Sequence, residues 1–539
     1  MRVCFRSSVQ PSLTGEYRRR HAAVWPEMLR ALKDAGWNNY SLFLGEDGLL
    51  IGYVECDDFD AVRARMALAD VNARWQAEMA SLFDNPDNPD RAPDEGFQLL
   101  EEVFNLDDQL AAAESTASGS TQAPAAGPQH HHHHTPNHSY TDRKNPIMND
   151  VATALGRLGE LAIEVPSWAY GNSGTRFKVF GTPGTPRTVQ EKIADAAKVH
   201  ELTGLAPTVA LHIPWDKVDD YAALKEYAAG LGVGLGTVNS NTFQDDEYKF
   251  GSLTSSNEPV RRRAIAHHLD CIEIMHATGS QDLKVWLADG TNYPGQDDLR
   301  GRQDRLAESL QEIYAGLGEN QRLVLEYKFF EPAFYHTDVP DWGTSYAQTL
   351  ALGEKALVCL DTGHHAPGTN IEFIVMQLLR LGKLGSFDFN SRFYADDDLI
   401  VGAADPFQLF RIMYEVIRGG GFGTSAGENS HVTLMLDQCH NLEEKIPGQI
   451  RSVLNVQEMT ARAMLVDTAA LGEAQREGDV LAANGVFNDA FYTDVRPILA
   501  DWRESRGLPA DPMAAFKASG YQKQINEDRV GGQQAGWGA

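Results

Sequence analysis

Residues 356–393 read ALVCLDTGHHAPGTNIEFIVMQLLRLGKLGSFDFNSRF, and this stretch decides the fold. A short apolar run ends at Asp361, residues 371–381 have the pattern and length of a helix, and a second apolar run ends near Asp388. The order is therefore strand, helix, strand. Ionisable side chains stand where the chain leaves each strand. This indicates that a functional site lies at the carboxyl ends of the strands.

The same unit recurs through the second half of the chain. Helical stretches at 221–230, 260–277, 299–316 and 407–417 separate further strand-like runs, and residues 163–172 can supply an eighth strand. The other runs end on polar side chains: His212, Asn239, Asp289, Glu326 with Lys328, and Asp437. This alternation predicts a (β/α)8 TIM barrel over residues 148–539. A doubly wound open sheet is the alternative, although it rarely presents polar groups from so many successive strands.

Four carboxylates at successive strand ends form the first candidate site: Glu326, Asp361, Asp388 and Asp437. If they point inward together they repel one another unless divalent cations neutralise them. A second site can form from His364, in a D-x-x-H motif, with Asp396 and Asp398 of YADDDL, although those two aspartates alone could equally belong to a solvated loop. Oxygen ligands with some imidazole favour Mn²⁺ or Mg²⁺ over structural zinc.

Residues 1–107 predict a separate, smaller domain. The runs 3–9, 39–45, 49–56 and 97–106 read as strands, and residues 58–83 as one helix. A first helix spans Tyr17 to Ala35, with a kink or break at Pro26. This order is typical of a ferredoxin-like α+β domain, of the dimeric α/β barrel type, whose open sheet face favours homodimers.

Three side chains of this small domain could carry chemistry. Tyr17 and His21 lie one helical turn apart and can act on a common ligand, and Trp75 can offer an apolar platform to a sugar. The alternative is that all three belong to the core or to a dimer interface.

Residues 108–147 predict a flexible linker between the two domains. They are rich in Ala, Ser, Thr, Gly, Pro and His, and they contain almost no large aliphatic side chain that could be buried. The run His130–His134 reads as a spacer without a catalytic part, and Met148 resembles a former start codon. The chain therefore reads as two once-separate proteins joined together.

Composition limits the class of protein. Of 539 residues, 42% are hydrophobic and 23% charged, which is ordinary for globular domains. The net charge of −28 makes nucleic acid and anionic membranes poor partners. No apolar run reaches about 18 residues, and five scattered cysteines indicate neither a disulfide framework nor a zinc cage. We expect a soluble, cytoplasmic, acidic protein.

Three segments of the small domain resemble the L-rhamnose mutarotase family: GEYRRRHAAVWPEM (15–28), AGWNNYSLFL (35–44) and DVNARWQAEM (70–79). The resemblance spans residues 1–104. It implies that Tyr17 and His21 act as general acid and base on the ring oxygen and the anomeric hydroxyl, that Trp75 contacts the sugar, and that no metal or cofactor is needed.

The larger domain resembles the broad-specificity type of L-rhamnose isomerase, a xylose-isomerase-like barrel, from about residue 150 to the end. The segments LVLEYKFFEPAFY (323–335), FNSRFYADDDL (389–399) and LMLDQCHN (434–441) carry much of the similarity. It implies a first cation on Glu326, Asp361 and Asp437, a second on His364, Asp396 and Asp398, and sugar contacts from His212, Trp286 and Lys328. One departure is Asp388, which stands where the family has a histidine ligand. Compared with a histidine ligand, an aspartate has a shorter side chain and adds a negative charge.

Together these resemblances predict a bifunctional sugar enzyme. The small domain interconverts anomers of L-rhamnose, and the barrel isomerises L-rhamnose to L-rhamnulose with two divalent cations, Mn²⁺ first and Mg²⁺ or Co²⁺ as alternatives. A metal-bound water oriented by Asp396 or Asp398 moves the hydroxyl protons, and a hydride shift is favoured over a cis-enediol route. The resemblance also implies barrel tetramers and mutarotase dimers.

Three alternatives remain open at this point. The barrel could isomerise another aldose, and the small domain could serve only as a dimerisation module. Metal-dependent endonucleases share this class of barrel, but the net charge of −28 argues against a DNA substrate.

Overall fold

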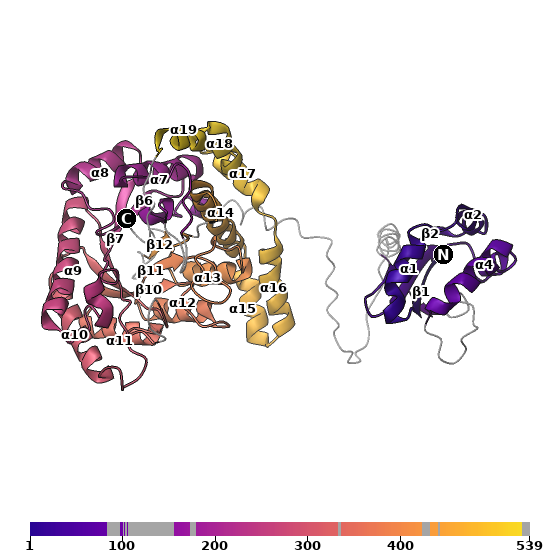
Figure 1. Ribbon diagram of the computed structural model, residues 1–539, viewed down its shortest axis with the longest axis horizontal. Coiled ribbons are helices and arrows are strands. Elements are labelled where there is room, and N and C mark those ends of the chain that lie inside the picture. Colours follow the sequence, from indigo (N-terminus) through magenta and orange to yellow (C-terminus); the bar gives the residue numbers. More distant parts are fainter. Residues whose placement is uncertain are drawn as a thin grey trace, which may run out of the picture. The chain divides into compact units, whose positions relative to one another are not determined.

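The computed structural model describes residues 1–83, 97–100, 102, 105, 156–172, 179–331, 336–422, 432–439 and 442–530. The chain divides into two compact units, Met1–Asn137 and His138–Ala539 (Figure 1). The predicted linker and Met148 lie outside the described residues, so the proposed boundaries at 107 and 147 stay predictions.

The small unit has the predicted ferredoxin-like topology. Its elements are β1 (Arg2–Ser8), α1 (Thr14–His21), α2 (Pro26–Asp34), β2 (Asn38–Leu44), β3 (Leu49–Glu55), α3 (Phe59–Ala67), α4 (Asp70–Met79) and β4 (Gln98–Leu100). The antiparallel sheet has the strand order β2-β3-β1-β4. Phe5, Val54 and Val62 are fully buried between the sheet and the helices. Pro26 begins α2, so the predicted break there is confirmed.

The single helix predicted over residues 58–83 is wrong. The segment forms α3, α4 and a 3-10 turn, Ala80–Leu82. The buried residues of α3 end at Met66, and those of α4 begin six positions later at Asn72. Six residues at about 100° each leave the two apolar stripes on different faces of one continuous helix. The break before Asp70 lets both stripes pack on the same sheet.

The large unit is the predicted barrel. Eight parallel strands close in the order β10-β11-β12-β5-β6-β7-β8-β9. Their bounds are β5 (Ile163–Pro166), β6 (Thr208–His212), β7 (Gly234–Asn239), β8 (Asp282–Trp286), β9 (Arg322–Glu326), β10 (Ala356–Asp361), β11 (Leu384–Phe389) and β12 (Thr433–Leu436). Each coincides with a run identified in the sequence, and the open doubly wound sheet is thereby excluded.

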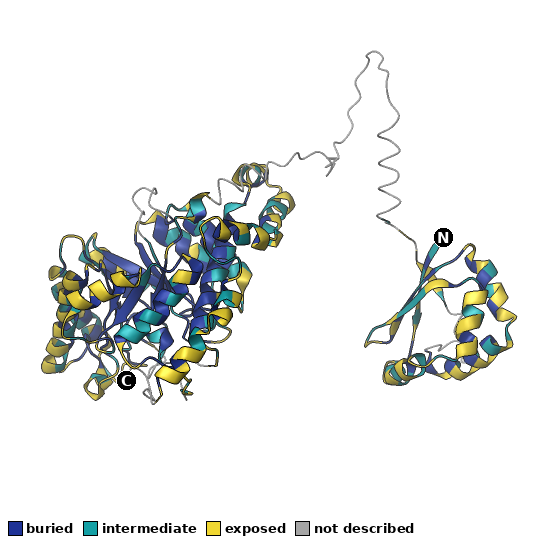
Figure 2. Ribbon diagram, turned by 90° about the horizontal axis from the view of Figure 1, so that it is seen from above, coloured by how far each residue is buried: buried dark blue, intermediate teal, exposed yellow. Residues whose placement is uncertain are grey.

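Helices surround this barrel, and Figure 2 shows the buried strands inside them. They are α7 (Val189–Thr203), α8 (Tyr221–Gly230), α9 (Glu258–Thr278), α10 (Leu299–Ala315), α11 (Trp342–Leu352), α12 (Ile371–Arg380), α13 (Pro406–Arg418) and α14 (Lys445–Met464). All five helices predicted by residue range for the large unit are present, with ends that agree within about two residues.

A helical extension completes the large unit. It comprises α15 (Thr468–Glu477), α16 (Val480–Tyr492), α17 (Arg496–Glu504), α18 (Pro512–Ser519) and α19 (Tyr521–Asp528). The extension is fixed to α7 by a buried ion pair, in which Arg529 Nη1 lies 2.7 Å from Asp195 Oδ2. No helix among the described residues is long and apolar enough to cross a lipid bilayer.

Candidate active site

A pocket opens at the carboxyl ends of the barrel strands. Clefts at this end of a barrel are where small-molecule sites of this fold lie. One side of it is acidic and the other aromatic. Its lining includes Trp168, His212, Trp215, Phe243, Lys284, Trp286, Glu326, Lys328, His364, Asp388, Asp396, Asp398 and Asp437.

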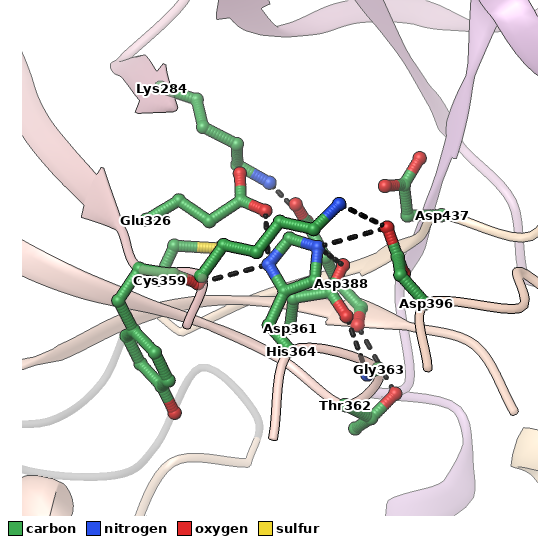
Figure 3. Close-up of polar contacts among 12 residues, drawn as sticks. Lys284, Glu326, Cys359, Asp361, Thr362, Gly363, His364, Asp388, Asp396 and Asp437 are labelled. Atoms are coloured by element: carbon green, nitrogen blue, oxygen red, sulfur yellow. Dashed lines mark hydrogen bonds and ion pairs between the residues drawn. The ribbon is translucent and has the colours of Figure 1, made fainter. Parts of the chain in front are cut away.

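The register of the parallel strands gathers the four strand-end carboxylates. Asp361 pairs with Asp388 across β10 and β11, and Glu326 ends the neighbouring β9. Oxygen atoms of Asp361, Asp388 and Asp437 lie within 4.8 Å of one another, and ligand atoms of Glu326, Asp361 and His364 do the same (Figure 3). Burial and the neighbouring Asp388 raise the pKa of both Glu326 and Asp437 well above the usual range.

Asp361 presents one oxygen atom to this cluster. Its Oδ1 accepts hydrogen bonds from the Gly363 amide at 2.6 Å and from Asn390 Nδ2 at 3.0 Å. Its buried Oδ2 accepts none from the described residues. Burial raises the pKa of Asp361 to about 6. A fully buried carboxylate with one fixed and one available oxygen fits a divalent cation.

His364 lies between the carboxylates. Its Nδ1 is 3.2 Å from Glu326 Oε1, and its Nε2 is 3.3 Å from Asp396 Oδ2 and 3.8 Å from Asp361 Oδ2. Burial opposes protonation, but Asp361 and Asp396 raise the pKa of His364 to about 10. The imidazolium thus supplies the positive charge that this position requires, and a cation can supply the same charge.

Asp396 and Asp398 are part of this site and do not form a solvated loop. Lys328 Nζ lies 2.7 Å from Asp396 Oδ2 and, with His364, holds the pKa of Asp396 well below its usual range against the effect of burial. Asp398 is buried, and burial together with Asp396 raises its pKa well above the usual range. Its φ of 49° lies in the left-handed region, and its side chain lines the pocket.

The opposite wall of the pocket is aromatic. His212 stacks on Trp215 with ring centroids 3.6 Å apart, and burial lowers its pKa well below the usual range, so its imidazole is neutral. Trp286 lies 4.6 Å from Phe243, and Lys328 Nζ lies 5.3 Å from its ring centroid. An apolar wall facing a polar one suits a small molecule that has both kinds of surface.

Several pocket residues were missed in the sequence. Trp168 donates a hydrogen bond of 2.9 Å from Nε1 to Asp437 Oδ1. The ammonium group of Lys284 forms a buried ion pair with Asp388. Lys284 stands two positions before Trp286, and the two-residue period of a strand places both on one face of β8. That spacing was the signal that could have identified the lysine.

The small unit brings its own three candidates together. The rings of Tyr17 and His21 stack with centroids 4.0 Å apart, and Trp75 meets His21 edge-on at 5.6 Å. Tyr17 and Trp75 are buried, and His21 is partly exposed. His21 Nδ1 lies 3.1 Å from the Tyr17 carbonyl oxygen. Burial raises the pKa of the Tyr17 hydroxyl and lowers that of His21, so both groups are neutral near pH 7.

Fold and site define a two-domain enzyme whose barrel pocket combines carboxylates and imidazoles with an aromatic wall. The family model described as L-rhamnose mutarotase matches residues 2–106. A probable sugar isomerase of Rhizobium meliloti is 42% identical over 385 residues, covering 70% of this chain and 89% of that protein. The L-rhamnose mutarotase of Pectobacterium atrosepticum is 40% identical over 108 residues, covering 20% of this chain and 99% of that protein.

A solved L-rhamnose mutarotase from Formosa agariphila is 29% identical, with a TM-score of 0.17, and covers 20% of this chain and 98% of that chain. The chain belongs to the L-rhamnose mutarotase family through its small domain and to the family of the probable sugar isomerases through its barrel.

Cation binding at the barrel site is expected to release protons and to strengthen as the pH rises. Near pH 7 the metal-free site holds a proton on His364, whose pKa is about 10, and the raised pKa values of Glu326, Asp398 and Asp437 favour further protons. A cation must displace them, so its affinity rises about ten-fold per pH unit for each proton lost. Calorimetric titration with MnCl₂ in buffers of different ionisation enthalpy measures the number of protons released on binding. An affinity independent of pH would contradict this.

Proposed function

We propose that the chain is a bifunctional enzyme of L-rhamnose metabolism. Its small domain interconverts the anomers of L-rhamnose, and its barrel isomerises L-rhamnose to L-rhamnulose with two divalent cations, preferably Mn²⁺. The observation that carries the proposal for the barrel is the pocket at the strand ends, in which buried carboxylates and His364 face an aromatic wall.

Two groups of residues would hold the cations. Glu326, Asp361, Asp388 and Asp437 would hold the first, and His364, Asp396 and Asp398 the second. The available Oδ2 of Asp361 lies between the two groups, 3.8 Å from His364 Nε2. When bound, the cations would polarise the sugar carbonyl and its neighbouring hydroxyl, so that charge developing on those oxygens is stabilised.

The protein side chains bind the sugar and handle its protons. His212 and the wall of Trp215, Phe243 and Trp286 exclude water and pack on the apolar surface of the sugar. Lys328 keeps Asp396 ionised against the effect of burial. Asp396 and Asp398 would orient the water that moves the hydroxyl protons of the sugar. We favour a hydride shift between C1 and C2 over a cis-enediol route.

The mutarotase domain would work without a cofactor. If His21 Nδ1 donates its proton to the Tyr17 carbonyl oxygen, Nε2 keeps the lone pair of a general base. The protonated Tyr17 hydroxyl can then act as the general acid at the ring oxygen. Trp75, edge-on to His21, would hold the apolar side of the pyranose.

We propose homodimers of the small domain through its open sheet face. The strand register places Phe43 opposite Ile51 on that face, and Phe43 is 62% exposed. Barrel tetramers are proposed on the resemblance to L-rhamnose isomerases alone. The linker would keep both active sites on one chain, so that sugar released by one site meets the other at raised effective concentration.

Treatment with EDTA is expected to abolish isomerisation of L-rhamnose and to leave anomer exchange intact. The barrel reaction depends on cations, and the reaction at Tyr17 and His21 does not. Ketose formation and anomer exchange, measured by NMR on the same sample before and after adding MnCl₂, check this. Loss of both activities in EDTA would contradict the two-site assignment.

The variant His21→Ala is expected to lower the rate of catalysed anomer exchange about a hundred-fold or more, because a general base is removed. Isomerisation measured at anomeric equilibrium should be unchanged. Arg19→Ala is the matched control, because Arg19 is an exposed residue of the same helix, α1. Unchanged exchange in His21→Ala would instead support a domain that only dimerises.

L-Rhamnose is expected to have the highest kcat/KM of the aldoses tested with Mn²⁺. The informative comparison is L-mannose, which differs only by a hydroxyl at C6. If the C6 end meets the aromatic wall, the methyl group is worth about ten-fold or more in kcat/KM. Trp286→Ala should reduce this ratio. A larger kcat/KM for another aldose would assign that sugar as the substrate.

A further inference from the structure

Within the part of the chain that the structure describes, Lys284 is the one strongly buried lysine or arginine of the pocket that the proposed reaction does not use. It stands in the middle of β8, and its side chain is 2% exposed. The ammonium group forms an ion pair with Asp388 Oδ1, whose side chain is also 2% exposed, and lies 3.8 Å from Met435 Sδ. Figure 3 shows it reaching Asp388 beside Glu326.

The charges of the site make this pair informative. The proposed ligands include six carboxylates, and among the described residues two lysines line the pocket, Lys284 and Lys328. Two lysines balance two of the six negative charges, and two divalent cations balance the remaining four. Without Lys284 the same site would keep one buried negative charge in excess, which is costly in a protein interior.

We infer that Lys284 is a positioning residue of the cation site, which holds Asp388 as a neutral ion pair and thereby limits how tightly the first cation binds. The inference rests on the proposed function, because it concerns the same cation site. Asp388 then adds an oxygen atom near the cation without adding net charge. Glu326, Asp361 and Asp437 supply the negative charge that attracts the ion.

The alternative is that Lys284 only fills space inside the barrel. The two roles differ in the sign of one measurable quantity, the affinity for Mn²⁺. If Lys284 only packs, its removal leaves the Mn²⁺ affinity unchanged or lowers it. A lysine that neutralises Asp388 strengthens cation binding when it is removed, because Asp388 is then free to attract the ion.

The test is calorimetric titration of the metal-stripped, full-length protein with MnCl₂. In Lys284→Met the affinity should rise at least about ten-fold, and in Asp388→Asn it should fall at least about ten-fold. The double variant restores the neutral pair and should lie within about three-fold of the original protein. Thermal unfolding without metal confirms that each variant is folded.

Lys383→Met is the matched control. Lys383 is a buried lysine of the same barrel, but its Nζ donates to the carbonyl oxygens of Thr349, Gly353 and Ala356, at 3.1, 2.8 and 2.8 Å. Its loss should lower the unfolding temperature and leave Mn²⁺ affinity unchanged. The control therefore distinguishes the effect of losing any buried lysine from the effect of losing the lysine beside Asp388.

An unchanged or lower Mn²⁺ affinity in a folded Lys284→Met overturns the inference. If that variant does not fold, the double variant is compared with Asp388→Asn, and removal of the lysine must still raise the affinity at least about ten-fold. Failure of the proposed function has a different signature: the original protein binds Mn²⁺ but does not isomerise L-rhamnose. The inference survives that result if the opposite effects of the two single variants are observed.

Discussion

Mutual repulsion among the carboxylates at the carboxyl end of the barrel is the constraint that organises the site. Glu326, Asp361, Asp388 and Asp398 are buried together, where water screens their charges poorly. Without metal, protonation and three cationic side chains, Lys284, Lys328 and His364, offset this charge. Divalent cations can replace the protons and the imidazolium charge. The affinity of the proposed isomerase site for cations, the pH dependence of that affinity and the chemistry of the site therefore follow from one electrostatic balance.

The loops above the barrel hold this balance in place. Buried Arg302 on α10 binds Asp338 through two nitrogen atoms, with Nη2 2.7 Å from Oδ2. The segment that contains Asp338 in turn holds the backbone of Lys328, whose amide donates to the Val339 carbonyl at 3.0 Å. A bidentate buried ion pair outside the pocket lining thus helps to fix the lysine that keeps Asp396 ionised. The small domain needs no such arrangement, because its candidate groups, Tyr17 and His21, are both neutral.

Much of the architecture could be predicted because it depends on local pattern. The eight strand-like runs, the helices between them and the break at Pro26 all follow from periodicity and from the properties of proline. The helix over 58–83 was predicted wrongly because the break before Asp70 serves packing on the sheet and has no strong local signal. Similarly, nothing local distinguishes Asp396 and Asp398 from a solvated acidic loop.

The sequence by itself determined which families the two halves resemble, and which strand ends carry carboxylates, imidazoles and aromatic rings. Only the tertiary structure decided how those groups are paired. Lys284 and Asp388 are separated by about a hundred positions in the chain, and β8 and β11 are not neighbours in the barrel. Their contact crosses the barrel interior, so strand periodicity can place each side chain inside but cannot match one to the other. Charge pairing across a closed barrel is a property of the fold.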